Sequence, residues 1–199
     1  MILVHGRGAG PANIMELSGP LAHPSFTYLA PAASGGTWYP NSFMAEIASN
    51  EPGLSSGLAV LAGLLSEIEA AGVPRGRTIL AGFSQGACLT CEFLVRHPAR
   101  YGAVLAFSGG LIGPPGTQWD TTGQLGGTPI FLGCSDVDAH VPKTRVDETA
   151  DVFRSMGASV EKRIYPGMGH LINEDELAFA RILVEAVMDQ DGGSAKAVM

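Results

Sequence analysis

The chain has 199 residues, of which 46% are hydrophobic and 16% are charged, and its formal net charge is -7 at pH 7. This length suits one domain with its own core, and the negative charge argues against nucleic acid or an anionic membrane as a partner. We find no run of 18 apolar residues and no signal-peptide pattern, and there are only three cysteines, so the sequence predicts a cytoplasmic globular protein with no membrane span.

Short apolar runs recur along the chain, and most of them are continuous rather than alternating. Continuous runs are typical of strands in a parallel sheet that helices cover on both faces. The six runs are Ile2–Val4, Phe26–Leu29, Thr78–Ala81, Ala103–Phe107, Pro129–Leu132 and Val160–Tyr165. The sequence therefore predicts a mainly parallel sheet of about six strands.

Four amphipathic segments predict helices among these strands. They are Leu54–Ala71, Gln85–His97, Val146–Met156 and a last helix that ends near Met188. Asn173 is the predicted N-cap of the last helix, with Glu176 as its capping-box partner. Alternating strands and helices predict one three-layer α/β domain over residues 1–189, without a domain boundary. Residues 190–199 carry no pattern and predict a loose tail.

The stretch AGFSQGA, residues 81–87, places Ser84 between two glycines, after a predicted strand and before a predicted helix. A strand, a tight turn and a helix around G-x-S-x-G are typical of a nucleophile elbow, in which Gly82 and Gly86 relieve the crowding. A serine hydroxyl becomes a useful nucleophile only beside a general base that a third group orients. The context therefore makes Ser84 the candidate nucleophile.

The base and the acid are expected on later loops at the same edge of the sheet. His170 follows the last predicted strand through the short sequence PGMG, so it is the expected base. The loop GCSDVDAHVP offers Asp136 or Asp138 as the acid. The order Ser, Asp, His along the chain is that of α/β-hydrolases. His140, in the same loop, could contact substrate or serve as a spare base, although a surface position explains it as well.

Two backbone N–H groups should stabilise the negative oxygen that forms when a serine attacks a carbonyl. The first is expected from Gln85, directly after the nucleophile, and the second from Arg7 in the loop HGRGAG after the first strand. The Arg7 side chain could also bind a substrate carboxylate, or simply face solvent. Cys88 and Cys91 form C-x-x-C within a predicted helix without a second ligand pair, so we expect core packing and no metal site.

An apolar pocket is expected beside the nucleophile, because small-molecule sites are mostly apolar with few polar groups. The candidate wall residues are Trp38, Tyr39 and Phe43, from a long segment without a predicted element, and Leu111 and Ile112, after the fourth predicted strand.

Five motifs in order, LVHGRGA, GFSQGA, SGGL, SDVDAHVP and YPGMGH, resemble the small serine carboxylesterases of the phospholipase/carboxylesterase family, which includes acyl-protein thioesterases. The resemblance covers nearly the whole chain. It implies an α/β-hydrolase fold, hydrolysis of carboxylic esters or thioesters, and no cofactor. The family's D-x-x-V-P pattern falls on Asp138, which the resemblance therefore implies as the acid. Relatives usually have one or two strands before the HG loop, so we expect the N-terminal strands to be trimmed here. This chain has the sequence HGRGA in that loop, where the thioesterases have a sequence similar to HGLGD.

We therefore expect a serine hydrolase that cleaves small or short-acyl carboxylic esters through an acyl-enzyme. An acyl thioesterase or lysophospholipase-type activity is the nearest alternative. A ligand-binding homologue without catalysis is the alternative from another class, because a fold does not fix a function. The uncovered edge of the sheet leaves room for a homodimer.

Overall fold

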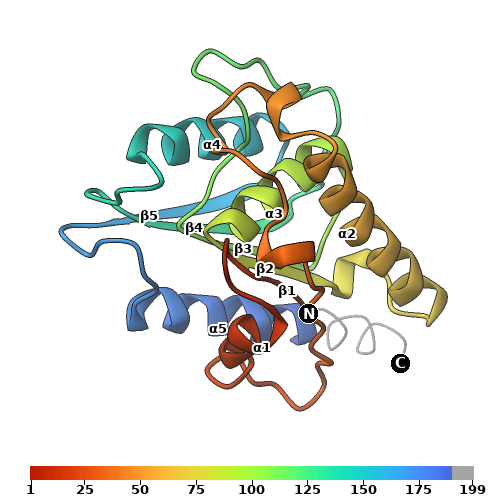
Figure 1. Cartoon of the computed structure of the whole chain (residues 1–199). Coiled ribbons are helices and arrows are strands. Elements are labelled where there is room, and N and C mark those ends of the chain that lie inside the picture. Colours follow the sequence, from red (N-terminus) through yellow and green to blue (C-terminus); the bar gives the residue numbers. More distant parts are fainter. Residues whose placement is uncertain (190–199) are drawn as a thin grey trace, which may run out of the picture.

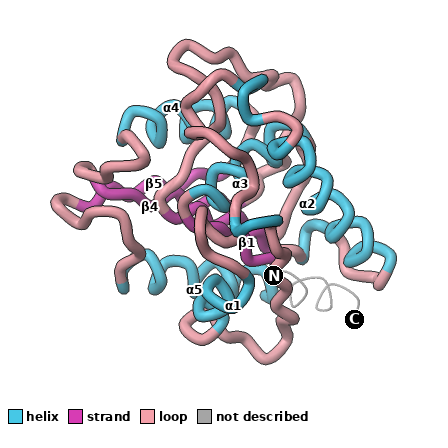
Figure 2. Tube along the Cα trace, in the orientation of Figure 1, coloured by secondary structure: helices cyan, strands magenta, loops and turns pink. Residues whose placement is uncertain are grey.

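A computed structural model describes residues 1–189, and the predicted tail at residues 190–199 lies outside this range. Five parallel strands form one sheet, in the order in which they occur along the chain (Figures 1 and 2). They are β1 (Ile2–Val4), β2 (Ile79–Phe83), β3 (Ala103–Phe107), β4 (Pro129–Ser135) and β5 (Ser159–Tyr165). The mainly parallel sheet is confirmed.

The predicted strand Phe26–Leu29 is wrong, which leaves five strands instead of about six. Only Leu29 pairs with β1, through an isolated parallel bridge to Ile2. The segment before it bends back on itself, because the Phe26 N–H donates to His23 O (3.0 Å) and the Tyr28 hydroxyl donates to Leu21 O (2.7 Å). Its aromatic rings pack on the apolar core instead of extending a ladder.

Helices cover both faces of the sheet, as Figure 1 shows. The helices are α1 (Pro11–Ile14), α2 (Gly53–Ala70), α3 (Gln85–Arg96), α4 (Lys143–Ser155) and α5 (Glu174–Asp189). Helices α2, α3 and α4 lie on one face, and α1 and α5 on the other. Each face of the sheet has its own hydrophobic core, and alternate residues of β2 point into different cores. Leu80 packs into one core, and Ile79 and Ala81 pack into the other. The three-layer α/β architecture is thus confirmed.

The ends of the helices differ from the predictions by a few residues. Helix α4 begins at Lys143 rather than at Val146, because the first turn closes on Pro142, whose carbonyl accepts the Arg145 N–H at 2.9 Å. The predicted capping box of α5 is confirmed: the Glu176 N–H donates to Asn173 Oδ1 (2.9 Å) and the Asn173 N–H donates to Glu176 Oε2 (2.8 Å). Short 3₁₀ turns occur at Met15–Ser18, Ser34–Gly36, Ile47–Asn50 and Arg75–Arg77.

Helix α2 is the one helix within residues 1–189 that is long and apolar enough to cross a membrane by length and composition, with 18 residues and a hydropathy of 1.2. Its apolar stripe of Leu54, Leu58, Leu61 and Leu65 is buried in the core beside α3. A core helix passes the same test of length and composition, so this helix is weak evidence for a membrane span.

The parallel register aligns the carboxyl ends of neighbouring strands. Val4 pairs with Gly82, Phe83 with Phe107, and Ser135 with Tyr165, according to the ladder register. The loops that follow β1, β2, β4 and β5 therefore leave the same edge of the sheet. In open α/β sheets this edge is where ligands bind.

Candidate active site

Ser84 lies on a strained turn between β2 and α3. Its backbone has φ 54° and ψ -121°, a region that side chains other than glycine rarely adopt. A Cβ on Gly82 would lie 2.6 Å from the Gly86 carbonyl, and a Cβ on Gly86 would lie 2.1 Å from Val4 O. The turn therefore requires both glycines, which allow the start of α3 to approach β1 and β2.

A chain of hydrogen bonds joins Ser84, His170 and Asp138. His170 Nε2 lies 2.9 Å from Ser84 Oγ, and His170 Nδ1 lies 2.7 Å from Asp138 Oδ2. Because an ionised carboxylate only accepts hydrogen bonds, Nδ1 carries the proton and Nε2 is free to accept the Ser84 hydroxyl. The structure thus brings together three side chains from the loops after β2, β4 and β5.

The Asp138 side chain is fully buried beneath His170. Its Oδ1 accepts the N–H groups of His140 (2.8 Å) and Val141 (3.0 Å). Burial alone would raise the pKa of this carboxyl, but the hydrogen bonds from His170 and from these two N–H groups outweigh it and hold the pKa below its usual value. Asp138 is therefore ionised near neutral pH, as an acceptor for the His170 ring must be.

Asp136 and His140 take different places in the acidic loop. Asp136 Oδ1 accepts the Gly167 N–H at 2.8 Å, so this carboxylate shapes the loop that carries His170. The His140 ring meets the His170 ring edge-on, with 4.7 Å between centroids, and Phe83 contacts His170 at 4.9 Å. The two rings restrict the orientation of the His170 imidazole.

The loop HGRGAG passes beside Ser84, because a Cβ on Gly6 would lie 3.3 Å from Ser84 Cβ. Gln85 opens α3, where the first N–H groups of a helix have no partner within it. Within residues 1–189, neither the Arg7 N–H nor the Gln85 N–H donates to a backbone carbonyl. Both groups are therefore free to bind an oxygen at the Ser84 turn.

The side chains of Arg7 and Gln85 both hold residues 38–41, which we call the wall segment. Gln85 accepts the Trp38 N–H (3.0 Å) and donates to Tyr39 O (2.8 Å). Arg7 donates to the carbonyls of Tyr39 (2.9 Å), Pro40 (2.8 Å) and Asn41 (2.6 Å). Sequence reasoning missed this arrangement, because contacts between residues 32 to 47 positions apart leave no local pattern.

A cavity of about 500 Å³ opens over Ser84. Its lining residues are Gly6, Arg7, Ala9, Asn13, Tyr39, Pro40, Asn41, Ser42, Phe43, Phe83, Ser84, Gln85, Cys88, His140, Val141 and His170. Of the expected wall residues, Tyr39 and Phe43 line it. Trp38 does not, because its ring is buried and its Nε1–H donates to His5 O at 2.9 Å. Leu111 and Ile112 do not line it either, because both are fully buried in the core.

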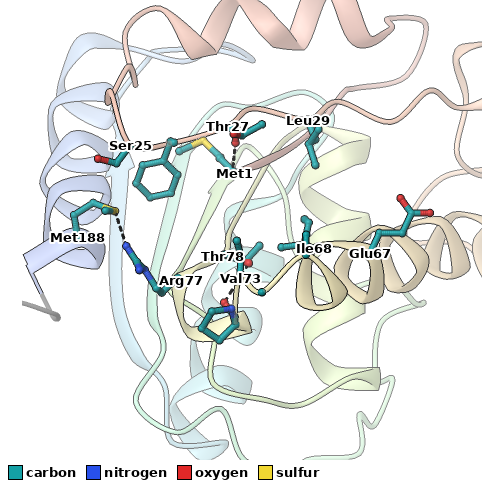
Figure 3. Close-up of a pocket in the computed structure, with 14 residues that line it drawn as sticks. Met1, Ser25, Thr27, Leu29, Glu67, Ile68, Val73, Arg77, Thr78 and Met188 are labelled. Carbon is teal, nitrogen blue, oxygen red and sulfur yellow. Dashed lines mark hydrogen bonds between the residues drawn. The ribbon is translucent and has the colours of Figure 1, made fainter.

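A second cavity, of about 550 Å³, lies at the opposite end of the sheet (Figure 3). Met1 and Thr78, which line it, directly precede β1 and β2. Arg77 contacts the Met188 sulfur at 3.8 Å, and the Met1 amino group donates to Thr27 O at 2.7 Å. The lining contains Ser25 but no histidine. The Ser25 N–H donates to His23 Nδ1 at 3.2 Å, but within residues 1–189 the Ser25 hydroxyl makes no hydrogen bond to a histidine.

No group of three His, Cys, Asp or Glu side chains in residues 1–189 could hold a metal ion. Cys88, Cys91 and Cys134 are free thiols and all are buried. Burial raises the pKa of Cys88 and of Cys134 to about 12, so both remain protonated. The prediction of core packing for Cys88 and Cys91 is confirmed.

Comparison with known proteins places the chain in a family. The phospholipase/carboxylesterase family model matches residues 1–188. The structure is similar to that of a phospholipase/carboxylesterase from Dyadobacter fermentans, with a TM-score of 0.87 and 38% identity over 94% of this chain and 88% of that one. It is also similar to esterase PE8, with a TM-score of 0.77 and 25% identity over 94% and 91% of the two chains.

Curated relatives match over shorter stretches. An acyl-protein thioesterase 1 of Eremothecium gossypii is 31% identical over 67% of this chain and 59% of its own length. A probable inactive carboxylesterase of Oryza sativa subsp. japonica is 26% identical over 62% of this chain and 50% of its own length. The matches thus span about half to three fifths of these relatives. Because the family model covers nearly all of the described residues and the fold agrees, this chain belongs to the phospholipase/carboxylesterase family, with an α/β-hydrolase fold.

Proposed function

We propose that this protein is a serine hydrolase that cleaves small or short-acyl carboxylic esters. The observation that carries the proposal is the hydrogen-bonded chain Ser84, His170 and Asp138, with the serine on a strained elbow at the mouth of a cavity. Structural and family similarity to esterases supports the same chemistry.

In the proposed acylation step, Ser84 Oγ attacks the ester carbonyl carbon while His170 Nε2 takes its proton. The carbonyl oxygen becomes negative and accepts the N–H groups of Arg7 and Gln85. Asp138 stabilises the imidazolium through Nδ1. The intermediate collapses, the carbon–alkoxide bond breaks, and His170 gives its proton to the departing alcohol.

In deacylation, His170 removes a proton from a water molecule, whose oxygen attacks the acyl-enzyme carbonyl. Collapse of the second intermediate breaks the bond to Ser84 Oγ, which recovers its proton from His170. The products are one carboxylic acid and one alcohol, and no cofactor takes part. The open cavity, with polar as well as apolar walls, favours small acyl groups.

The first experiment is intact-mass measurement after reaction with a fluorophosphonate probe. We expect one adduct on the wild type and none on Ser84→Ala, because only an activated serine reacts. An adduct that persists in Ser84→Ala would contradict the assignment of the nucleophile. A folded wild type that remains unlabelled would favour the non-catalytic alternative, which the similarity to the probable inactive carboxylesterase of Oryza sativa makes worth testing.

Thioester hydrolysis is the second candidate activity, because the curated relatives include acyl-protein thioesterases. An oxygen ester and a thiol ester of the same short acyl group separate the two activities. A larger kcat/KM for the oxygen ester is expected. A thiol ester preferred at least tenfold would establish the thioesterase alternative, and best activity on acyl chains of about twelve carbons would contradict the short-acyl proposal.

A further inference from the structure

The Arg7 guanidinium is fixed in place by neutral acceptors. The three carbonyls of the wall segment accept its Nη1 and Nη2 hydrogens at 2.6 to 2.9 Å, and the cation lies over the Tyr39 ring at 5.9 Å. Within residues 1–189, no carboxylate lies within ion-pair distance of Arg7. Its positive charge is therefore oriented but not compensated.

The same side chain retains hydrogen-bond donors. A guanidinium has five N–H groups, of which the wall segment takes three. The Nε–H and one Nη1–H donate to no acceptor in the described part of the chain, and the exposed side chain lines the cavity over Ser84. Because its orientation is already set, binding an anion would cost little further ordering.

The charge around this cavity is opposite to that of the whole protein. The chain carries a formal net charge of -7, yet no aspartate or glutamate lines the cavity, and Arg7 alone among its lining residues has a fixed charge. The Asp138 charge lies beneath His170, fully buried and engaged by four hydrogen bonds: from the His170 ring, the N–H groups of residues 140 and 141, and the Cys134 thiol. Asn13 also lines the cavity.

We propose that Arg7 forms an anion subsite and that the preferred substrates are carboxylic esters that also carry a carboxylate, such as half-esters of small dicarboxylic acids. The inference rests on the proposed function, because the subsite matters only if Ser84 attacks an ester in this cavity. Arg7 then has two separate roles: its backbone N–H binds the oxyanion, and its side chain selects the substrate.

Two matched pairs of esters test this subsite. The first pair carries the charge on the acyl side: monophenyl glutarate against the phenyl ester of glutaric acid monoamide. The second carries it on the alcohol side: 4-acetoxybenzoate against 4-acetoxybenzamide. For at least one pair we expect the wild type to show a kcat/KM at least 10-fold higher for the anion at low ionic strength. Added salt should reduce this ratio, because salt screens exposed charges.

Variants separate the charge from the support of the wall segment. Arg7→Met should bring the ratio of anionic to neutral ester close to one, and any loss of wall support should lower both rates alike. Arg7→Lys should keep most of the preference. Arg77→Met, which removes the same charge at the opposite cavity, should leave the ratio unchanged.

The outcomes distinguish the two proposals. A wild type that hydrolyses the neutral and anionic esters of both pairs equally would overturn the anion subsite alone. A preference that survives in Arg7→Met would also overturn it. A folded wild type that neither hydrolyses these esters nor reacts with the fluorophosphonate would overturn the proposed function, and the subsite with it.

Discussion

The two ends of the sheet carry cavities of nearly equal volume, about 500 Å³ over Ser84 and about 550 Å³ near Met1. They differ in what converges on them. At the carboxyl end, a strained serine, an oriented histidine and free N–H groups meet. At the amino end, the lining is mainly apolar, and the Ser25 hydroxyl makes no hydrogen bond to a histidine within residues 1–189. Convergent polar groups, rather than cavity volume, therefore distinguish the candidate site.

The largest difference in kcat between the two ends of the sheet should come from replacing a carboxylate with an amide of the same shape. Asp138→Asn should lower kcat by about 10³- to 10⁴-fold, because an amide can hold His170 in the wrong tautomer. Glu67→Gln, at the other cavity, should leave kcat within about twofold. Steady-state hydrolysis of a neutral acetate ester measures both. A loss below tenfold in Asp138→Asn would remove Asp138 from the mechanism.

Adding a methyl group to a glycine should also have different effects on stability at the two ends of the sheet. Gly86→Ala should lower the free energy of unfolding by about 3 kcal/mol or more, since its Cβ would lie 2.1 Å from the Val4 carbonyl. Gly72 lies at the other cavity with φ 89° and no atom within 4 Å of such a Cβ, so Gly72→Ala should cost about 1 kcal/mol. Urea unfolding measures both, and equal costs would contradict the tight packing of the elbow.

Removing the hydrogen bonds that hold the wall segment should have a smaller effect on kcat. Gln85→Met keeps the backbone N–H and the side-chain length but removes the hydrogen bonds to Trp38 and Tyr39. We expect kcat to fall about tenfold with KM little changed, because the donor is less well fixed in the transition state. Thr78→Val, at the amino end, is the matched control. An effect on KM alone would assign Gln85 to substrate binding instead.

An effect on stability smaller than that of Gly86→Ala concerns a buried carboxyl in the first turn of α5. Burial raises the pKa of Glu176 from 4.5 to about 7, and its Oε1 has no hydrogen-bond partner within residues 1–189. The unfolded chain therefore loses this proton at lower pH than the folded one. The stability that Glu176 contributes is present below about pH 4.5 and is lost as pH rises towards 7.

Glu176→Gln should abolish this dependence on pH. Urea unfolding between pH 5 and pH 8 should show the wild type losing about 2–3 kcal/mol more than the variant. Asp138 affects stability in a different pH range. Because its pKa is lowered in the folded protein, the stability that it contributes is lost only as pH falls below the usual pKa of aspartate. Parallel curves for wild type and Glu176→Gln would refute the assignment.

Much of the fold could be predicted because its signals are local. Short apolar runs, most of them continuous, identify the positions of β1 to β5, and the Asn173–Glu176 pair marks the start of α5. The segment Phe26–Leu29 has the same apolar composition, yet only Leu29 pairs with β1. Whether an apolar run extends a ladder depends on how the chain before it turns. Here that turn depends on contacts of Tyr28 with residues 21 and 23, which the strand pattern does not encode.

In the candidate site, too, some residues could be predicted from local patterns and others could not. Ser84, His170 and Asp138 follow from the motifs and the order of the strands, and the structure brings them together. The pocket walls follow less well, because an apolar residue after a strand can face a cavity or the core. Tyr39 and Phe43 face the cavity, whereas Leu111 and Ile112 are buried. The contacts of Arg7 and Gln85 with the wall segment depend on tertiary structure alone.

The all-parallel sheet has a consequence for how the protein is made. Ser84 and its hydrogen-bond partner His170 are 86 positions apart, and the loop that carries His170 follows the last strand of the sheet. A ribosome-bound chain that ends before β5 holds Ser84 without the histidine that is its hydrogen-bond partner. Reaction with the fluorophosphonate should therefore begin only when the final strand and α5 have been synthesised. Under the proposed function, the appearance of activity would mark the moment at which β5 joins the sheet of a nascent chain.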